Sequence, residues 1–270
     1  MPKYLKLISI FSLGIAMTLF SCKKEKQNEI VKQKDEAPSS IPKCPPGEDP
    51  VLFYSDLFLS DPTFEVVIDK FGNNAFNIFK TLHEIGGDDL MKEYSGLISS
   101  YTDYRQIEQF YEDHKIDPDM MLTSKAEILA SLLLLYKDHP DFYALKLNEQ
   151  ITVITNVFKT LKSSEYRANN PKNPVVLRYN QVIALPNGGA PSMARLTMDE
   201  VGDCLEDAII GGIANSIGVI RNLYNVITGY NLGFSGIVNV AKSALRTIVG
   251  SSAIGALVGF GLCCAWEAIW

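Results

Sequence analysis

The residue types that most often perform catalysis or bind metals are sparse in this chain of 270 residues. Its three histidines are His83, His114 and His139. His83-Glu84 begins like the motif of zinc proteases, but that motif needs a second histidine four residues after the first, and Gly87 stands there instead. The pair Asp117-x-Asp119 lacks the remaining oxygens and the glycine of a calcium loop. We therefore expect no metal site from these residues.

A search for nucleophiles and phosphate-binding loops is equally unproductive. The sequence contains no Gly-x-Ser-x-Gly elbow, no phosphate-binding loop and no Cys-x-x-Cys pair. One predicted helix carries a cluster of titratable residues, namely Glu108, Glu112, Asp113 and His114, and Asp88-Asp89 stands at the start of another. Water and the helix dipole favour carboxylates in such places, so we interpret both groups as solvated faces. The sequence indicates no catalytic residue and no cofactor, and an enzyme would have to be built from residues distant in sequence.

The elements that would position these residues are predicted to be helices. In the acidic region 51–165, each of Asp61-Pro62, Asp117-Pro118 and His139-Pro140 ends one element and starts the next. Gly86-Gly87 ends a helix that runs from about Ala75. A last helix carries an apolar stripe that consists of Leu147, Ile151, Ile154, Phe158 and Leu161.

Two sequence patterns predict how helices begin. Ser124-x-x-Glu127 has the spacing of a capping box ahead of an apolar run, and Thr197-x-x-Glu200 is a second such box at the start of a long helix over about 198–230. Between the two helical parts, residues 166–196 are rich in proline, asparagine and glycine. We interpret them as a connector with loops and one or two short strands around the apolar run 175–185.

The C-terminal region 197–270 is predicted to form an apolar, glycine-rich helical hairpin. Helix 198–230 is followed by a turn at 231–236 and by a second helix over 237–268, and antiparallel folding about this turn brings residue 204 level with residue 263. Small residues that repeat every four positions would let the two helices approach closely; they are Ala208, Gly212 and Ser216 in the first helix, and Ser251, Gly255, Gly259 and Cys263 in the second. The sequence thus predicts a mainly α fold that is organised around this hairpin.

The second helix of this hairpin contains 20 uncharged residues, 247–266, which is long enough to cross a bilayer. Its predicted partner helix carries Asp203, Glu206, Asp207 and Arg221, which makes that helix a poor membrane span. We therefore expect the apolar helix to lie in the protein core under the helices of 51–165, and membrane insertion is the alternative.

The N-terminal residues indicate where the protein resides. Lys3 and Lys6 precede an apolar segment over 7–20, which has the length of a signal peptide and is too short for a good transmembrane helix. The four residues that end this stretch, Leu19-Phe20-Ser21-Cys22, resemble the lipobox of bacterial lipoproteins. The resemblance implies that residues 1–21 are a signal peptide and that Cys22 carries acyl chains such as palmitate, which would anchor the protein in the cell membrane or outer membrane, facing the periplasm or the cell exterior. A plain secretory signal is the alternative.

The residues that follow the proposed anchor are expected to form a flexible tether over 22–50. Residues 23–50 hold six lysines, six acidic residues and five prolines, too few apolar side chains to form a core. Without the signal peptide the chain has 23 basic and 31 acidic residues, a net charge of −8, and residues 51–170 alone carry a charge of −8. An acidic surface argues against nucleic acid as a partner.

The cysteines suggest disulfide bonds. The chain has five, Cys22, Cys44, Cys204, Cys263 and Cys264, and four remain if Cys22 is lipidated, in a setting that favours oxidation. A bond between the adjacent residues 263 and 264 is strained, because neighbouring Cα atoms lie about 3.8 Å apart whereas disulfides prefer about 4.4–6.8 Å. We therefore expect Cys204 to bond to one member of the pair and Cys44 to the other. Reduced, buried cysteines are the alternative.

These observations leave three hypotheses for the function. The first is a lipid-anchored envelope protein whose helical domain binds an unknown partner or ligand or plays a structural part. The second is a membrane-active antibacterial protein, because a glycine-rich apolar hairpin beside acidic amphipathic helices is similar in composition to pore-forming bacteriocins. The third is an envelope enzyme of unknown chemistry.

Overall fold

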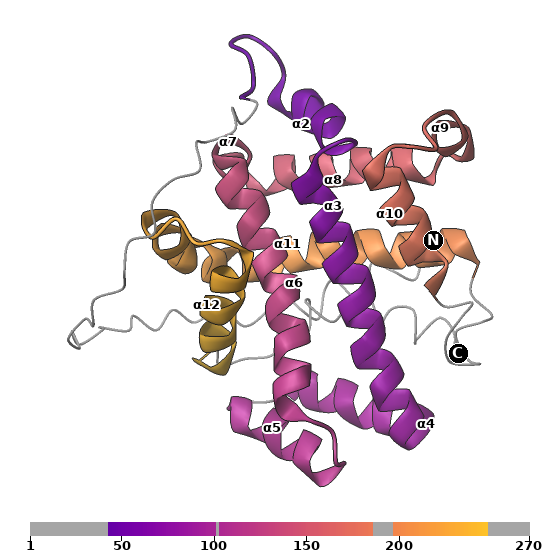
Figure 1. The fold of residues 1–270 in the computed structure, drawn as a ribbon, viewed down its shortest axis with the longest axis vertical. Coiled ribbons are helices and arrows are strands. Elements are labelled where there is room, and N and C mark those ends of the chain that lie inside the picture. The colour runs from indigo at the N-terminus through magenta and orange to yellow at the C-terminus, as the bar shows by residue number, and fades with distance from the viewer. Residues whose placement is uncertain (1–42, 101–102, 186–196, 248–270) are drawn as a thin grey trace. The chain divides into compact units, whose positions relative to one another are not determined.

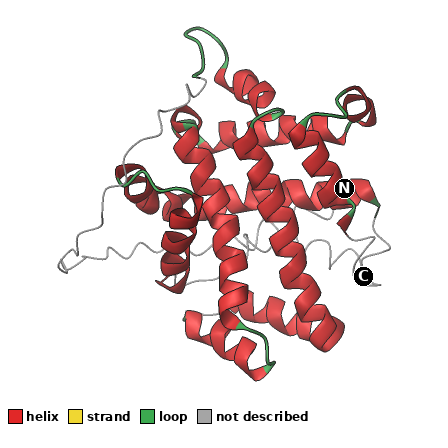
Figure 2. Ribbon diagram, viewed as in Figure 1, coloured by secondary structure: helices red, strands yellow, loops and turns green. Residues whose placement is uncertain are grey.

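The computed structural model describes residues 43–100, 103–185 and 197–247, and within these ranges all regular structure is helical (Figure 2). The mainly α fold is thereby confirmed. The elements are α2 (Pro50–Phe58), α3 (Pro62–Asp69), the π-helical turn η1 (Lys70–Asn74), α4 (Ala75–Ser100), α5 (Tyr104–Asp113), α6 (Pro118–Asp138), α7 (Pro140–Tyr143), α8 (Leu147–Lys162), α9 (Ser164–Asn169), α10 (Pro174–Ile183), α11 (Met198–Gly229) and α12 (Phe234–Thr247).

Proline and aspartate set the helix starts as predicted. Helices α3, α6 and α7 begin at Pro62, Pro118 and Pro140, because proline has the backbone φ that the first helical position needs and no amide hydrogen that would stay unpaired. The Asp61 carboxylate accepts a hydrogen bond from the amide of Phe64 at 2.9 Å. The predicted capping box at the start of α11 is also present.

Helix α6 lies in the middle of the helical assembly (Figure 1). Helices α3, α11 and α12 pack against it, and α8 packs against α2 and α11. Because neighbours surround it, α6 buries side chains on most of its faces, among them Leu129, Leu132, Leu133, Leu135 and Tyr136. This explains why its sequence is apolar almost all round rather than along one stripe.

The prediction of strands in the connector was wrong. Residues 174–183 form helix α10, which Asn173 caps by accepting a hydrogen bond from the amide of Val176 at 3.1 Å. Its buried residues recur at helical spacing, and they are Val175, Val176, Tyr179, Val182 and Ile183. A short apolar run next to proline and asparagine fits both a strand and a capped helix. Packing against α3 and α11 favours the helix.

The capping box predicted at Ser124 was also wrong. Helix α6 already begins at Pro118, with Asp117 as its cap, so Ser124 lies inside the helix. Its hydroxyl donates to the carbonyl of Met120 at 3.2 Å, one turn back in the same helix.

The predicted helix end near Gly86-Gly87 corresponds to a sharp break within α4. Gly87 has φ 62° and ψ −152°, a backbone conformation that side-chain-bearing residues rarely adopt. The chain then continues as a helix to Ser100 in a new direction. This second part of α4 and helix α5 lie together at the lower end of the view in Figure 1.

The C-terminal region has a long helix and the start of a second one, as predicted, and the second begins at Phe234 rather than at 237. Helix α11 runs from Met198 to Gly229 and α12 from Phe234 to Thr247. Helix α12 packs mainly along α6 and only to a lesser extent against α11. The continuation of α12 to residue 268, the full antiparallel pairing and the apolar stretch beyond Thr247 lie outside the described residues and stay predictions. None of the described helices combines the length and the hydrophobicity that crossing a membrane requires.

The small-residue ridge of α11 has neighbours in the described residues, whereas its predicted partner at 251–263 lies outside them and that pairing stays a prediction. At Gly212, an added Cβ would lie 2.7 Å from the ring of Phe71 and 3.5 Å from Leu132. Ala208 and Ser216 are buried on the same face. This ridge therefore lets α11 approach η1 and α6 closely.

Candidate functional site

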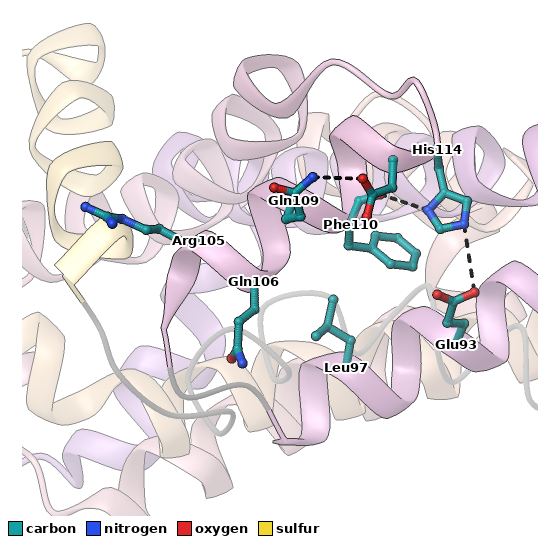
Figure 3. Close-up of a pocket in the computed structure, with 8 residues that line it drawn as sticks. Glu93, Leu97, Arg105, Gln106, Gln109, Phe110 and His114 are labelled. Atoms are coloured by element: carbon teal, nitrogen blue, oxygen red, sulfur yellow. Dashed lines mark hydrogen bonds and ion pairs between the residues drawn. The ribbon is translucent and has the colours of Figure 1, made fainter.

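A groove lies between the second part of α4 and helix α5, and we call it the α4–α5 groove. Its volume is about 660 Å³, within the range of ligand-binding pockets. The lining residues are Glu93, Leu97, Arg105, Gln106, Gln109, Phe110, Asp113 and His114 (Figure 3). Leu97 and Phe110 form an apolar floor, and polar side chains surround it.

One end of the groove presents hydrogen-bond acceptors. The Nδ1 atom of His114 lies 2.8 Å from the carbonyl oxygen of Phe110, and since a carbonyl only accepts, Nδ1 carries the proton. In the neutral ring the other nitrogen, Nε2, then holds a lone pair, and it lies 3.8 Å from the Glu93 carboxylate. The Asp113 carboxylate accepts from Gln109 at 2.8 Å and stays exposed. We call Glu93, Asp113 and His114 the acceptor end.

The opposite end carries a positive charge. Arg105 stands in the first turn of α5, and its side chain points away from the acceptor end in Figure 3. No ion pair joins Arg105 to another residue of the described ranges. The neighbouring Gln106 completes the capping box of α5, because its side-chain oxygen accepts from the amide of Asp103 at 3.3 Å. The groove is therefore apolar along its floor and oppositely charged at its ends.

A buried lysine lies close to the groove, held between three tyrosines. Lys125 of α6 is fully buried, and its Nζ donates a hydrogen bond to the Tyr111 hydroxyl at 2.7 Å. That hydroxyl lies 2.7 Å from the hydroxyl of Tyr94. The Nζ atom also lies 4.9 Å from the ring centroid of Tyr111, 5.5 Å from that of Tyr94 and 5.9 Å from that of Tyr104. Such distances allow cation–π attraction.

Burial shifts the titration of this cluster. It lowers the pKa of Lys125 from 10.5 to about 7, because a charged amine loses its hydration inside the protein. Burial first, and then the neighbouring Tyr94, raises the pKa of Tyr111 well above its ordinary value. Within the described ranges no carboxylate pairs with Lys125, so the fold holds an amine that is only partly protonated at neutral pH.

The floor of the groove connects it to the lysine cluster. The ring of Phe110 lies 4.5 Å from that of His114, 5.5 Å from that of Tyr94 and 5.8 Å from that of Tyr111, measured between centroids. Phe110 therefore contacts two of the tyrosines that surround Lys125, and it also lines the groove. A ligand in the groove would rest on a rigid aromatic layer.

The other two histidines lie elsewhere. His139 is buried, and its Nε2 lies 3.1 Å from the Asp61 carboxylate, which links the start of α7 to the start of α3. Aromatic rings surround it, including those of Tyr54 and Phe58. We interpret the contact between His139 and Asp61 as structural. His83 lies 3.5 Å from Asp88 across the break in α4. The structure thus brings Asp113 and His114 together with Glu93, and leaves the remaining histidines outside the site.

The candidate disulfide residues are described only in part. Cys44 is a free thiol, so the bond expected for it is not present in the described ranges. Cys204 is buried and disulfide-bonded. Cys22, Cys263 and Cys264 lie outside the described ranges, so lipidation at Cys22 and the pairing of Cys204 with Cys263 or Cys264 stay predictions.

Neither a group of metal ligands nor a known relative identifies the chemistry of the site. In the described part of the chain, no three side chains of histidine, cysteine, aspartate or glutamate come together as metal ligands would. Comparison with known protein families, with characterised proteins and with solved structures yields no match.

Proposed function

We propose that this chain is a lipid-anchored protein of the bacterial cell envelope whose helical domain binds a partner protein in the α4–α5 groove. The anchor is Cys22, and the tether 22–50 would carry the domain away from the membrane surface. The basic residues, the apolar segment and the cysteine at positions 3–22 support the anchor, and the groove supports binding.

The observation that carries the binding role is the construction of the groove. Its apolar floor is surrounded by polar side chains, and this combination is typical of binding sites, in which apolar contact supplies affinity and a few polar groups supply orientation. The groove is open between two helices rather than enclosed. An open groove suits an elongated segment of a partner protein better than a small molecule, which a site usually surrounds.

The experiment combines fractionation with co-purification of the tagged, full-length protein after cross-linking in cells. Cys22→Ser should move the protein from the membrane fraction to the soluble fraction. Leu97→Arg should place a charged side chain in the groove and abolish recovery of the cross-linked partner. Leu177→Arg is the matched control, because Leu177 is an exposed leucine of α10 outside the groove. Unchanged membrane association without acyl mass on the mature N-terminus contradicts the anchor, and equal recovery with Leu97→Arg contradicts the groove.

A second candidate function, an envelope enzyme, is favoured by one observation. An amine with a pKa of about 7 is partly unprotonated at neutral pH and can act as a nucleophile or base. Lys125 is fully buried, however, so a substrate would reach it only after surrounding side chains such as Tyr111 moved aside. Borohydride trapping with a small aldehyde tests this candidate, because labelling at Lys125 in the native protein requires such access.

A further inference from the structure

We propose that the α4–α5 groove binds a basic segment of its partner protein, with a lysine or arginine side chain of that segment held at the acceptor end. This inference depends on the proposed function and deepens it, because it states which chemistry the groove recognises. It follows from the hydrogen-bonding capacity of Glu93, Asp113 and His114, from their place on helix α5 and from the ring beside them.

The hydrogen-bonding capacity of the acceptor end is unbalanced. With the Nδ1 proton of His114 donated to the Phe110 carbonyl, the neutral ring offers only a lone pair at Nε2. Its distance of 3.8 Å from Glu93 is too long for a hydrogen bond between the two groups. The Glu93 and Asp113 carboxylates are also acceptors. A ligand group that donates several hydrogen bonds would satisfy Nε2 and the Glu93 carboxylate, which lie 3.8 Å apart, and ammonium and guanidinium groups are such donors.

The position on the helix adds to this preference. Asp113 is the last residue of α5 and His114 is its C-cap, so the acceptor end coincides with the negative end of the helix dipole. Lysine or arginine of a ligand would be stabilised there for the same reason that basic residues are common in the last turn of helices. No lysine or arginine of the described ranges forms an ion pair with Glu93 or Asp113, and the basic group nearest to Glu93 is the His114 ring at 3.8 Å.

The ring of Phe110 provides the third argument. It lies between Leu97 and His114 in Figure 3, at the boundary between the apolar floor and the acceptor end. An aromatic face attracts a cation, and the floor suits the aliphatic part of a lysine or arginine side chain. At the far end, Arg105 favours an acidic residue or a backbone carbonyl of the same segment. Charge complementarity thus sets the direction in which the segment lies.

The test is a selection of short random peptides displayed against the full-length protein in detergent micelles. The selection is repeated against the double variant Glu93→Gln/Asp113→Asn, and against the control Glu84→Gln/Glu112→Gln, which removes two exposed carboxylates from the same helices outside the groove. Peptides enriched on the wild type and on the control should share a lysine or arginine at one position and should not be enriched on the groove variant.

A synthetic copy of the most enriched peptide then gives the quantitative result. Replacing its basic residue by norleucine should weaken binding to the wild type roughly tenfold or more, the effect of losing a charge-assisted hydrogen bond. The same replacement should have little effect on binding to Glu93→Gln/Asp113→Asn, because the acceptors are already altered. Binding should be unchanged by a chelator and should not be displaced by lysine amide at the peptide's own concentration.

Two results of the selection would overturn the inference: no enrichment, or enriched peptides without a shared basic residue. Two results of the binding measurements would do the same. The norleucine peptide could lose as much affinity for Glu93→Gln/Asp113→Asn as for the wild type, or lysine amide could bind as tightly as the peptide, which would indicate a small-molecule site. These results are distinguishable from failure of the proposed function. If Leu97→Arg abolishes partner recovery in cells while Glu93→Gln/Asp113→Asn does not, the groove binds a partner but does not recognise a basic side chain.

Discussion

Because Lys125 is buried, the free energy of unfolding should rise with pH above neutrality. The pKa of this amine is about 7 in the folded protein and 10.5 in the unfolded chain. Between these values the unfolded chain binds more protons, so stability rises with pH. Below about pH 7 both states are protonated and this contribution is constant. A rise from pH 7 to pH 9 should increase the free energy of unfolding by about 2 kcal/mol.

Lys125→Met tests this expectation. The variant should lose the rise between pH 7 and pH 9, and at pH 7 its free energy of unfolding should exceed that of the wild type by about 1–4 kcal/mol, because a buried charge is replaced by an apolar side chain of similar volume. Urea unfolding at several pH values measures both effects. Lys159→Met, at an exposed position of α8, should keep the slope of the wild type. A Lys125→Met variant with that slope unchanged would show that another group titrates.

The burial of Lys125 could not be predicted from the sequence. Lys125 stands between Ser124 and Ala126 in a helix, where a lysine usually faces solvent. Only the docking of Tyr94, Tyr104 and Tyr111 from another part of the chain encloses it. Asp113 and His114 were interpreted as a solvated face for the same reason, because Glu93, which completes the acceptor end, comes from a different helix.

At the scale of elements, helix α11 depends on a close approach at Gly212. Gly212→Ala should lower the free energy of unfolding by about 1–3 kcal/mol, because the added methyl group would lie 2.7 Å from the ring of Phe71, which is itself fully buried. Gly218→Ala is the matched control on the same helix, since nothing lies within 4 Å of its Cβ position. It should raise stability by up to about 1 kcal/mol. Thermal or urea unfolding compares the two, and equal effects would contradict this account of the packing.

The break in α4 is held by backbone conformation rather than by packing. An added Cβ at Gly87 would meet nothing within 4 Å, yet φ 62° with ψ −152° is unfavourable for any residue with a side chain. Gly87→Ala should therefore lower the free energy of unfolding by about 1–3 kcal/mol. Gly96→Ala, in open space on the same helix, should not. Because the break orients the groove, peptide binding should weaken in Gly87→Ala as well; unchanged stability and binding would contradict the role of this break.

Helix starts were predictable where one residue type fixes the backbone. Proline after aspartate or histidine located α3, α6 and α7, and the threonine–glutamate box located α11. The capping box predicted at Ser124 was wrong because α6 already begins at Pro118. The helix at 174–183 was missed because its loop-forming neighbours resemble the flanks of a strand, while the contacts that favour a helix come from distant segments.

At the scale of the whole molecule, the sequence predicted the class of fold but not the groove. Helical periodicity is local, so a mainly α fold could be predicted from the spacing of apolar residues. The groove arises where the second part of α4 turns at Gly87 and meets α5, and neither helix contains the site alone. The helix that includes α12 was expected to lie under the helices of 51–165, but the sequence did not indicate that α6 would be its main neighbour.

The last prediction concerns how the C-terminal region is fixed to this helical assembly. Cys204 is buried on α11 and disulfide-bonded, whereas Cys44 is a free thiol near the start of α2. Peptide mapping without reduction should find Cys204 joined to a peptide that contains Cys263 and Cys264. Such a bond would close a loop of about 60 residues, so Cys204→Ser should lower the free energy of unfolding by about 2–5 kcal/mol.

Cys44→Ser is the matched control for this bond. The pKa of the Cys44 thiol is raised, first by desolvation and then by nearby carboxylates, chiefly that of Glu48, so the thiol stays protonated at neutral pH and should react slowly with alkylating reagents. Its replacement should change stability little. A mapped peptide that joins Cys44 to Cys204, or equal losses in the two variants, would refute the assignment. If Cys204 is instead alkylated in the unfolded, unreduced protein, no disulfide fixes the C-terminal region, and its attachment then depends on the apolar contacts of α12 with α6.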